Sequence, residues 1–509
     1  METVLEAPRA GRREWIGLAV LALPNLLVSI DVFVMLLALP HLSRALGASS
    51  SQQLWIMDGY GFLLSGFLIT MGTLGDRIGR RRLLLLGAAG FGVASVLAAY
   101  APNTISLIAA RMLLGIAGAT LAPSMLALIS NMFRDARQRG LAIGIWFACF
   151  MGGTAIGPVV GGLMLEHFWW GSVFLLGVPI MLVLLAVGPF LLPEYRDPGA
   201  GRLDPASVAL SLAAILPIVY GLKELARGGA RPGPALAVAA GLAFGVLFVR
   251  RQQRLEHPLL HLALFRGRAF STALSSMFFG TMLMGALMMF ITTHLQLVQG
   301  LPAGRAGLWL LPAVLGGLVS VLVAPLLARR LRPAYLIGGG IAVSVCGLLL
   351  LTRVGTGSAP WLIATGFALT NLGAGPFITL GTGLVIGAAP PERAGAAAAL
   401  NETSGEFGFA LGVALLGSLG TAIYRGLLGA DLPTGLPAEA AAGVRDSLAG
   451  AVAQAARLPE PVADQVLGAA RTAFTTGMHA AALVSATVLA IVAVVIVRAL
   501  RHVPPTPAP

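Results

Sequence analysis

The 509-residue chain is 57% hydrophobic and only 11% charged, with a mean hydropathy of +0.87. A water-soluble chain of this length would form two or three domains with far more charge on their surfaces, so this composition excludes an ordinary soluble protein. The net charge of +13 does not indicate nucleic-acid binding, because the basic residues lie in short connections between apolar segments.

Apolar segments recur from end to end, and each is long enough to cross a hydrocarbon core of ~30 Å as an α-helix. The predicted spans are residues 15–40, 53–75, 83–101, 104–130, 141–165, 172–192, 206–222, 234–250, 270–295, 306–328, 334–352, 359–387, 396–421 and 473–498. The first is too long for the apolar part of a signal peptide, and no small-residue cleavage site follows it.

The Lys/Arg distribution predicts the orientation of these spans. Most of the 34 basic residues fall on one side, with the densest cluster at residues 77–82. We therefore assign that side to the cytoplasm, and the even number of spans places both termini there. The connection at residues 223–231 is an exception, because its basic residues would lie outside, but the other connections together favour this orientation.

A weak internal repeat divides the chain. Residues 74–80 are echoed by residues 326–332, where an arginine and a second arginine three residues later again follow a span. Transporters use such repeats to build two bundles around a site at the midplane. We predict an all-α membrane protein with a cytoplasmic N-terminus (1–14), an N-terminal six-helix bundle (15–192), a linker with two extra spans (193–250), a C-terminal six-helix bundle (251–498) and a cytoplasmic tail (499–509). Within the second bundle we expect an external loop at 422–472, with helical pieces near 437–456 and 460–472.

The connection after the second span reads Gly-Thr-Leu-Gly-Asp-Arg-Ile-Gly-Arg. Gly72 and Gly79 permit a tight turn and close helix contact. Asp76 can pair with an arginine or cap the next helix, while Arg77 and Arg80 face the cytoplasm. A turn that only retains positive charge would need the arginines but not this glycine and aspartate spacing.

The fifth span contains a second motif, with Gly153, Gly157, Pro158, Gly161 and Gly162 within ten residues. The proline removes a backbone hydrogen bond and kinks the helix, and the glycines flatten one of its faces. The alternative is a helix in which these residues serve close packing alone.

Arg111 lies inside the fourth span, where a charge costs ~2.5–3.5 kcal/mol on insertion scales. It therefore needs a partner, and Asp31 lies at a similar depth in the first span. Either this pair takes part in proton coupling or it is a purely structural ion pair.

Three further acidic residues fall inside predicted spans: Asp58, Glu402 and Glu406. A carboxylate in a medium of low dielectric constant can bind a proton or exchange it for a cation. Glu402 and Glu406 are four residues apart and therefore share one helix face. Both Asp58 and Glu406 also have a structural interpretation. Asp58 could be a hydrated carboxylate at the membrane interface, and Glu406 could form a hydrogen bond between packed helices.

A hydrophobic cation would suit an acidic cavity with an aromatic and methionine-rich wall, because aromatic faces attract cations and methionine adapts to varied shapes. The candidate wall residues are Trp55, Trp146, Phe150, Met288 and Phe290. Each of them could equally face lipid or a neighbouring helix.

Together these motifs resemble the major facilitator superfamily, and within it the fourteen-helix drug:H+ antiporters of the Qac type, which export quaternary ammonium compounds and other drugs. The 72–80 connection matches the superfamily's signature. The Gly157-Pro158 motif matches that of its antiporters, which uptake symporters lack. Leu114 and Gly177 depart from the Gln and Asn that are common at the corresponding family positions.

The resemblance implies a secondary active transporter of the bacterial cytoplasmic membrane that exports hydrophobic organic cations in exchange for protons. It implies no cofactor beyond H+ as the coupling ion, no metal, no nucleic-acid partner and a monomer within the lipid bilayer. An exporter of an envelope lipid or an endogenous metabolite would share every motif and remains the alternative. No phosphate-binding loop, zinc-ligand spacing or catalytic triad indicates an enzyme or drive by ATP.

Overall fold

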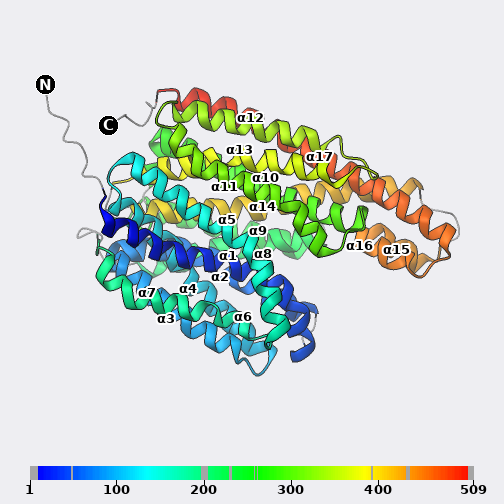
Figure 1. The fold of residues 1–509 in the computed structure, drawn as a ribbon, viewed down its shortest axis with the longest axis horizontal. Helices are drawn as coiled ribbons and strands as arrows, with labels where there is room; N and C mark the ends of the chain where they lie inside the picture. Colours follow the sequence, from blue (N-terminus) through cyan, green and yellow to red (C-terminus); the bar gives the residue numbers. More distant parts are fainter. Residues whose placement is uncertain are drawn as a thin grey trace.

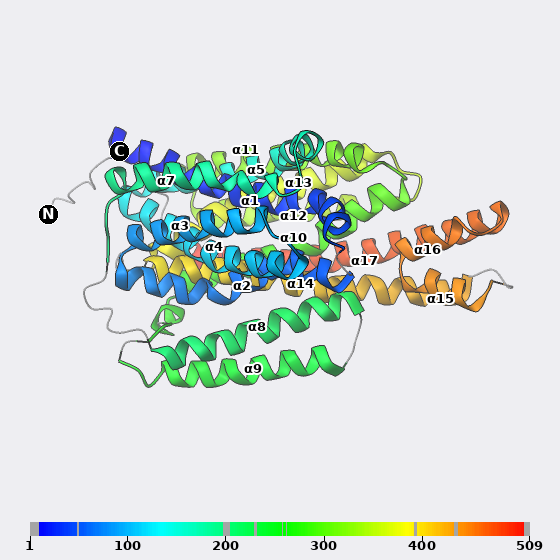
Figure 2. The same cartoon turned by 90° about the horizontal axis from the view of Figure 1, so that it is seen from below.

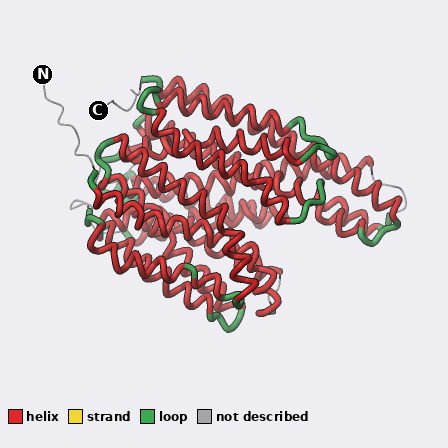
Figure 3. The backbone as a smooth tube through the Cα atoms, in the orientation of Figure 1, coloured by secondary structure: helices red, strands yellow, loops and turns green. Residues whose placement is uncertain are grey.

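The computed structural model describes residues 10–47, 50–196, 204–228, 232–256, 258–260, 262–390, 394–431 and 436–502. Across these residues all regular structure is helical and no strand occurs (Figure 3). The long helices run side by side, and both ends of the chain lie at the same end of the bundle (Figure 1). We call this the terminal end and the opposite one the distal end.

The N-terminal half forms one bundle around a shared apolar core, in which Leu21, Phe91 and Phe133 are almost fully buried. Its helices are α1 (Arg12–Leu46), α2 (Ser50–Ile78), α3 (Arg80–Ala99), α4 (Thr104–Met132), α5 (Ala136–His167), α6 (Ser172–Leu175) and α7 (Gly177–Leu191). Local capping fixes where some begin: Asn103 and Ser106 form a reciprocal capping box at the start of α4.

The predicted span at 172–192 is interrupted, because α6 ends at Leu175 and α7 begins at Gly177. Pro179 explains the interruption. It has no N–H, so it cannot donate the helical hydrogen bond that would satisfy the Leu175 carbonyl.

The C-terminal half packs around a second core, which includes Ile291, Ile337, Ile363 and Met478. Its long helices are α10 (Arg268–Thr293), α11 (Ala303–Leu327), α12 (Pro333–Leu351), α13 (Pro360–Gly387), α14 (Ala394–Asp431) and α17 (Glu460–Leu500). A short 3₁₀-helix, η1 (Leu262–Arg266), precedes α10, and a π-helical turn, η2 (His294–Val298), follows it.

Between the halves in sequence, α8 (Pro205–Gly228) and α9 (Pro232–Gln252) form a helix pair. The pair lies as a separate layer beside α2 and α14 (Figure 2), and α8 contacts both of them. At the terminal end of the pair, Arg251 Nε donates to Asp204 Oδ2 at 2.7 Å. Hydrogen bonds from Arg251 and Ser207 hold the pKa of Asp204 well below its usual range. The pair therefore covers one of the two seams between the halves.

The prediction of a long external loop at 422–472 is wrong in extent. The helix α14 continues to Asp431, and α17 begins at Glu460, so residues 460–472 are the start of the last long helix. The alanine-rich sequence carries both helices past their apolar segments, because alanine favours helix whether or not lipid surrounds it. Pro459 and Pro461 do not break this helix, since proline is tolerated at a helix start.

The expected helical piece near 437–456 is present but divided. Ser447 ends α15 (Ala438–Asp446) and caps α16 (Leu448–Ala455) through a hydrogen bond from Gly450 N. Both short helices pack with the extended ends of α14 and α17 at the distal end, where the Tyr424 hydroxyl donates to the Val444 carbonyl at 2.9 Å.

By length and composition, twelve helices of the described chain can cross a membrane. The twelve include α8 and α9. In this count α6 and α7 together form one span.

The close contact between α10 and α14 depends on a glycine, Gly412, which has no side chain. A Cβ added at Gly412 would lie 1.6 Å from the Met282 carbonyl oxygen. We expect Gly412→Ala to destabilise the protein by about 1–3 kcal/mol, because the two backbones would have to separate. Thermal unfolding in detergent measures this loss.

The matched control is Gly339→Ala in α12, where a Cβ would meet nothing within 4 Å. This change should be neutral or stabilising by up to about 1 kcal/mol, since alanine is the better helix former. Equal unfolding temperatures for the two variants would contradict the close α10–α14 contact.

Candidate functional site

The motif at the end of α2 forms a buried ion pair. Arg80 Nε donates to Asp76 Oδ1 at 2.8 Å, and its Nη2 also bonds to Asp76 and to the Gly72 carbonyl. The Arg80 side chain is completely buried. The structure thus brings Gly72, Asp76 and Arg80 together as one unit, whereas the sequence alone left open which arginine pairs with Asp76.

This unit also joins the two halves. Asp76 Oδ2 accepts a hydrogen bond from Ala396 N, in the first turn of α14, at 3.1 Å. The first N–H groups of a helix have no partner within it and carry partial positive charge, so a carboxylate there is stabilising. A Cβ at Gly72 would clash with Ala399, and one at Gly395 would clash with Arg80. In this conformation α2 and α14 are therefore held in contact at the terminal end.

Gly79 makes the turn that the sequence indicated, with a φ of +112° that favours glycine. Glu194, which sequence reasoning missed, then caps the next helix by accepting bonds from Arg81 N at 3.1 Å and Arg82 N at 3.2 Å. The only signal for it was an acidic residue just past the end of an apolar segment, on the arginine-rich side.

The arginine inside α4 has the predicted partner. Arg111 Nη1 donates to Asp31 Oδ2 at 2.8 Å, with the two side chains 2% and 12% exposed. Arg111 Nε donates to the Ile56 carbonyl at 3.1 Å, and the guanidinium lies 4.9 Å from the centroid of the Tyr60 ring. The ion pair therefore links α1, α2 and α4 in the middle of the N-terminal half.

The two glutamates of α14 differ in their surroundings. Glu402 is half-buried, whereas the Glu406 side chain is exposed although it belongs to an apolar helix. Glu406 is close enough to Tyr60 of α2 for its charge to act on the phenol. Acidic residues of both halves, Asp31 and Glu406, are thus near enough for their charges to act on one buried tyrosine.

The predicted cavity wall is only partly accessible. Trp55 is 39% exposed and packs edge-on against Phe62, with ring centroids 6.0 Å apart, while Phe150 and Met288 are half-buried. Trp146 and Phe290 do not face a cavity here, because only 2% and 3% of their surfaces are exposed.

The surroundings of these two buried rings show why. Trp146 lies in the core of the N-terminal half, where its carbonyl accepts from Asn25. The Phe290 ring fills the space beside Gly420 and packs on Phe474.

The glycines of the fifth-span motif face α1. A Cβ at Gly153 would clash with Ser29 and Leu26, and one at Gly161 would clash with Val34. Gly157 is buried, and Gly162 has open space beside it. The motif thus builds the close contact between α1, which carries Asp31, and α5.

Two predicted site residues lie partly outside the description, because the side chains of Asp58 and Pro158 are not among those that the structure describes. Arg77 lies in the last turn of α2, directly after Asp76, and is half-buried.

Comparison with known proteins shows which family the chain resembles. The family described as "Major Facilitator Superfamily" matches residues 21–429. The multidrug efflux pump LfrA of Mycolicibacterium smegmatis is 43% identical over 97% of this chain and 98% of its own length. The methyl viologen resistance protein SmvA of Salmonella typhimurium is 34% identical over 93% of this chain and 95% of its own.

Solved structures share the fold at low sequence identity. The human organic anion transporter MFSD10 is 16% identical, with a TM-score of 0.56 over 94% of this chain and 99% of its own. A bacterial homologue of the human lysosomal transporter Spinster, in an inward-facing conformation, is 17% identical, with a TM-score of 0.57 over 98% of this chain and 100% of its own.

The buried pair at the terminal end generates a stability test. Asp76→Asn leaves the Arg80 guanidinium buried beside a neutral amide, so we expect a loss of about 3–5 kcal/mol. Asp204→Asn removes a carboxylate of the same type from the more exposed pair with Arg251, and asparagine can still cap α8 at Ser207 N, so its loss should be clearly smaller. Thermal unfolding of both variants in detergent makes the comparison, and similar losses would argue against a dominant role of the buried pair.

Proposed function

Because the chain belongs to the major facilitator superfamily and is a multi-span protein of the bacterial cytoplasmic membrane, we propose that it is a proton-coupled antiporter that exports hydrophobic organic cations. The observation that carries the proposal is the buried Arg111–Asp31 ion pair, at 2.8 Å, in the middle of the N-terminal half. A carboxylate in such a place can hold a proton in one step of a cycle and a positive charge in another. Efflux of drugs, rather than enzymatic chemistry, agrees with the names of the relatives.

The region between the two halves supports a cationic substrate. Glu406 of α14 is exposed and acts electrostatically on Tyr60 of α2, and Trp55 offers an accessible aromatic face. A carboxylate and aromatic rings together attract quaternary ammonium compounds and dyes. One relative is named for resistance to methyl viologen, a divalent organic cation, which agrees with this chemistry.

We further propose the arrangement in the membrane. The helices α2 and α5 contain 29 and 32 residues and would complete fourteen spans together with the twelve that qualify by composition. The arginine-rich terminal end would face the cytoplasm, as the Lys/Arg bias indicates. The contact between Asp76 and α14 would then close the cytoplasmic side, and a single chain would contain the whole transport path.

Asp31→Asn tests the coupling. The amide keeps the size of the side chain but cannot exchange a proton, so efflux of ethidium driven by a pH gradient should fall by about tenfold or more, equivalent to ~1.4 kcal/mol or more. Transport into inverted vesicles measures this, with Asp204→Asn as the matched control. Ethidium binding by the purified variant shows that it is folded, and gradient-driven efflux at the normal rate would contradict the proposal.

Glu406→Gln tests the substrate charge. A second cationic group gains from a second carboxylate, so the Kd for methyl viologen should rise by about tenfold while that for monovalent ethidium changes by about twofold, a difference of ~1 kcal/mol. Binding titrations of the purified protein measure both constants. Glu460→Gln, at the exposed start of α17, is the control, and equal losses for both cations would leave Glu406 with a structural role alone.

A further inference from the structure

Five exposed arginines gather at the terminal end of the C-terminal half. They come from the turn between α11 and α12 and from the end of α17, and we call them the arginine cluster: Arg329, Arg330, Arg332, Arg498 and Arg501. Arg332 Nη1 donates to the Arg501 carbonyl at 3.0 Å, which joins the two segments. A Cβ added at Gly338 would clash with Val497, so the start of α12 packs on the end of α17 (Figure 1).

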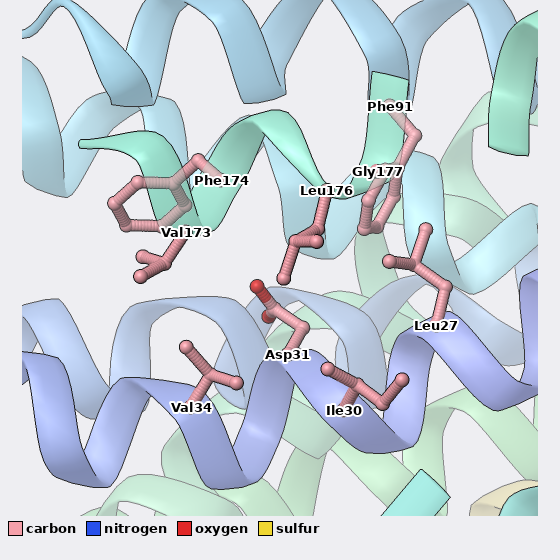
Figure 4. Close-up of a pocket in the computed structure, with 9 residues that line it drawn as sticks. All are labelled: Leu27, Ile30, Asp31, Val34, Phe91, Val173, Phe174, Leu176 and Gly177. Carbon is pink, nitrogen blue, oxygen red and sulfur yellow. The ribbon is translucent and has the colours of Figure 1, made fainter. Parts of the chain in front are cut away.

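Arginines of the N-terminal half, in contrast, have carboxylate partners. Arg80 pairs with Asp76, and Glu194 lies 3.7 and 3.9 Å from the next two arginines of the chain. Even Asp31, whose carboxylate points among apolar side chains of α1, α3, α6 and α7 (Figure 4), is bound by Arg111. These positive charges are therefore balanced within the protein.

The arginine cluster has no such internal balance. The helices α11 and α12 and the turn between them contain no aspartate or glutamate, and α17 has none after Asp464, near its distal start. Within the described part of the chain, none of the five arginines forms an ion pair. Orientation in the membrane requires arginines on this side but does not require that carboxylates be missing. Because like charges gathered this closely repel one another, the cluster favours an anion from outside the chain.

The surface next to the cluster suits the apolar part of a lipid. On α17, Val494 and Ile491 come four and seven residues before Arg498 and therefore share its helix face, where they are 51% and 60% exposed. On α12, Tyr335 follows Arg332 by three residues and is 54% exposed. Tyrosine is typical of the level at which headgroups meet hydrocarbon. The arginines thus lie at headgroup level, and an apolar face leads from them along α17.

We propose that the arginine cluster binds the headgroup of an anionic phospholipid, with the phosphate between Arg332 and Arg501 and the acyl chains on the face of α17 that carries Val494. The planar guanidinium group matches the oxygens of a phosphate and can bind two of them at once. The leaflet at the terminal end supplies this lipid directly. One bound headgroup would tie the α11–α12 turn to the end of α17. The inference goes beyond the proposed function and does not depend on which substrate is exported.

Lipid binding to the purified protein tests the site. Native mass spectrometry with dioleoylphosphatidylglycerol and dioleoylphosphatidylcholine gives a Kd for each lipid. The anionic lipid should bind about tenfold more tightly or better, because the two headgroups differ in net charge. Replacing Arg329, Arg332 and Arg501 together by glutamine should raise the Kd for the anionic lipid about tenfold or more and leave the other within about twofold.

The matched control removes the same charge from the terminal end of the other half. Arg12→Gln, Arg82→Gln and Arg134→Gln, all at exposed positions, should together change the Kd for phosphatidylglycerol by less than about twofold. Phosphatidylglycerol should also raise the unfolding temperature of this control more than that of the cluster variant, because a ligand stabilises the fold that binds it. Equal losses of affinity in the two triple variants would overturn the proposal, since only the total charge would then matter.

A second variant keeps every arginine. Leu331 lies between Arg330 and Arg332 and is 48% exposed. Leu331→Glu gives the cluster a carboxylate of its own and should raise the Kd for phosphatidylglycerol about tenfold, whereas Leu331→Gln should stay within about twofold of the natural protein. If both variants bind the lipid equally well, its phosphate does not lie at the cluster and the proposal is wrong.

Inorganic phosphate separates a lipid site from a site for a free anion. In large excess and at constant ionic strength, it should leave phosphatidylglycerol bound, because it has no chains to lie on α17. Displacement of the lipid by phosphate alone would assign the cluster to free phosphate and overturn the lipid assignment.

Discussion

A charge placed among apolar helices must be neutralised by another group, and this constraint organises the molecule at two levels. In the middle of the N-terminal half, Arg111 and Asp31 tie α1 to α4. At the terminal end, Arg80 and Asp76 neutralise each other, and the remaining oxygen of Asp76 binds the start of α14. Partners of a buried charge cannot separate without large cost, so each pair fixes the helices that carry it. The first pair lies within one half, whereas the second joins both halves and can open only if another conformation offers Asp76 a different donor.

Close backbone contact is the second organising feature, since helices in lipid gain little from burying apolar surface against one another. Glycines on α5 admit α1, and glycines on α14 admit α10. Because the α1–α5 contact involves Ser29, two residues from Asp31, the glycines of α5 help to position Asp31, the proposed coupling residue.

Features encoded by short-range pattern were predictable from the sequence. The apolar segments gave the positions of the long helices, and the depth of Arg111 in its span indicated Asp31. Features set by packing or by distant residues were not predictable. Hydropathy did not show that α14 continues to Asp431 or that α17 begins at Glu460, because alanine forms helix readily but is only weakly apolar. Trp146 and Phe290 have the composition of a cavity wall, but only the neighbouring helices decide that they lie in cores. Glu194 meets Arg81 from more than a hundred residues away, and no local pattern contains that pairing.

The inserted pair α8–α9 is attached to the two halves by different kinds of contact. Both of its connections bind the terminal end of α2 and α3 through directional hydrogen bonds, from Arg80 N to the Tyr195 carbonyl and from the Thr73 hydroxyl to the Leu259 carbonyl. Against α14 it packs through apolar side chains, with Leu222 lying on two alanines, Ala410 and Ala414. Hydrogen bonds break when their atoms shift by an ångström, whereas a leucine can slide over a smooth alanine surface with little change in energy. If the two halves move relative to each other, the pair would therefore stay attached to the N-terminal half, slide over α14 and keep this seam covered.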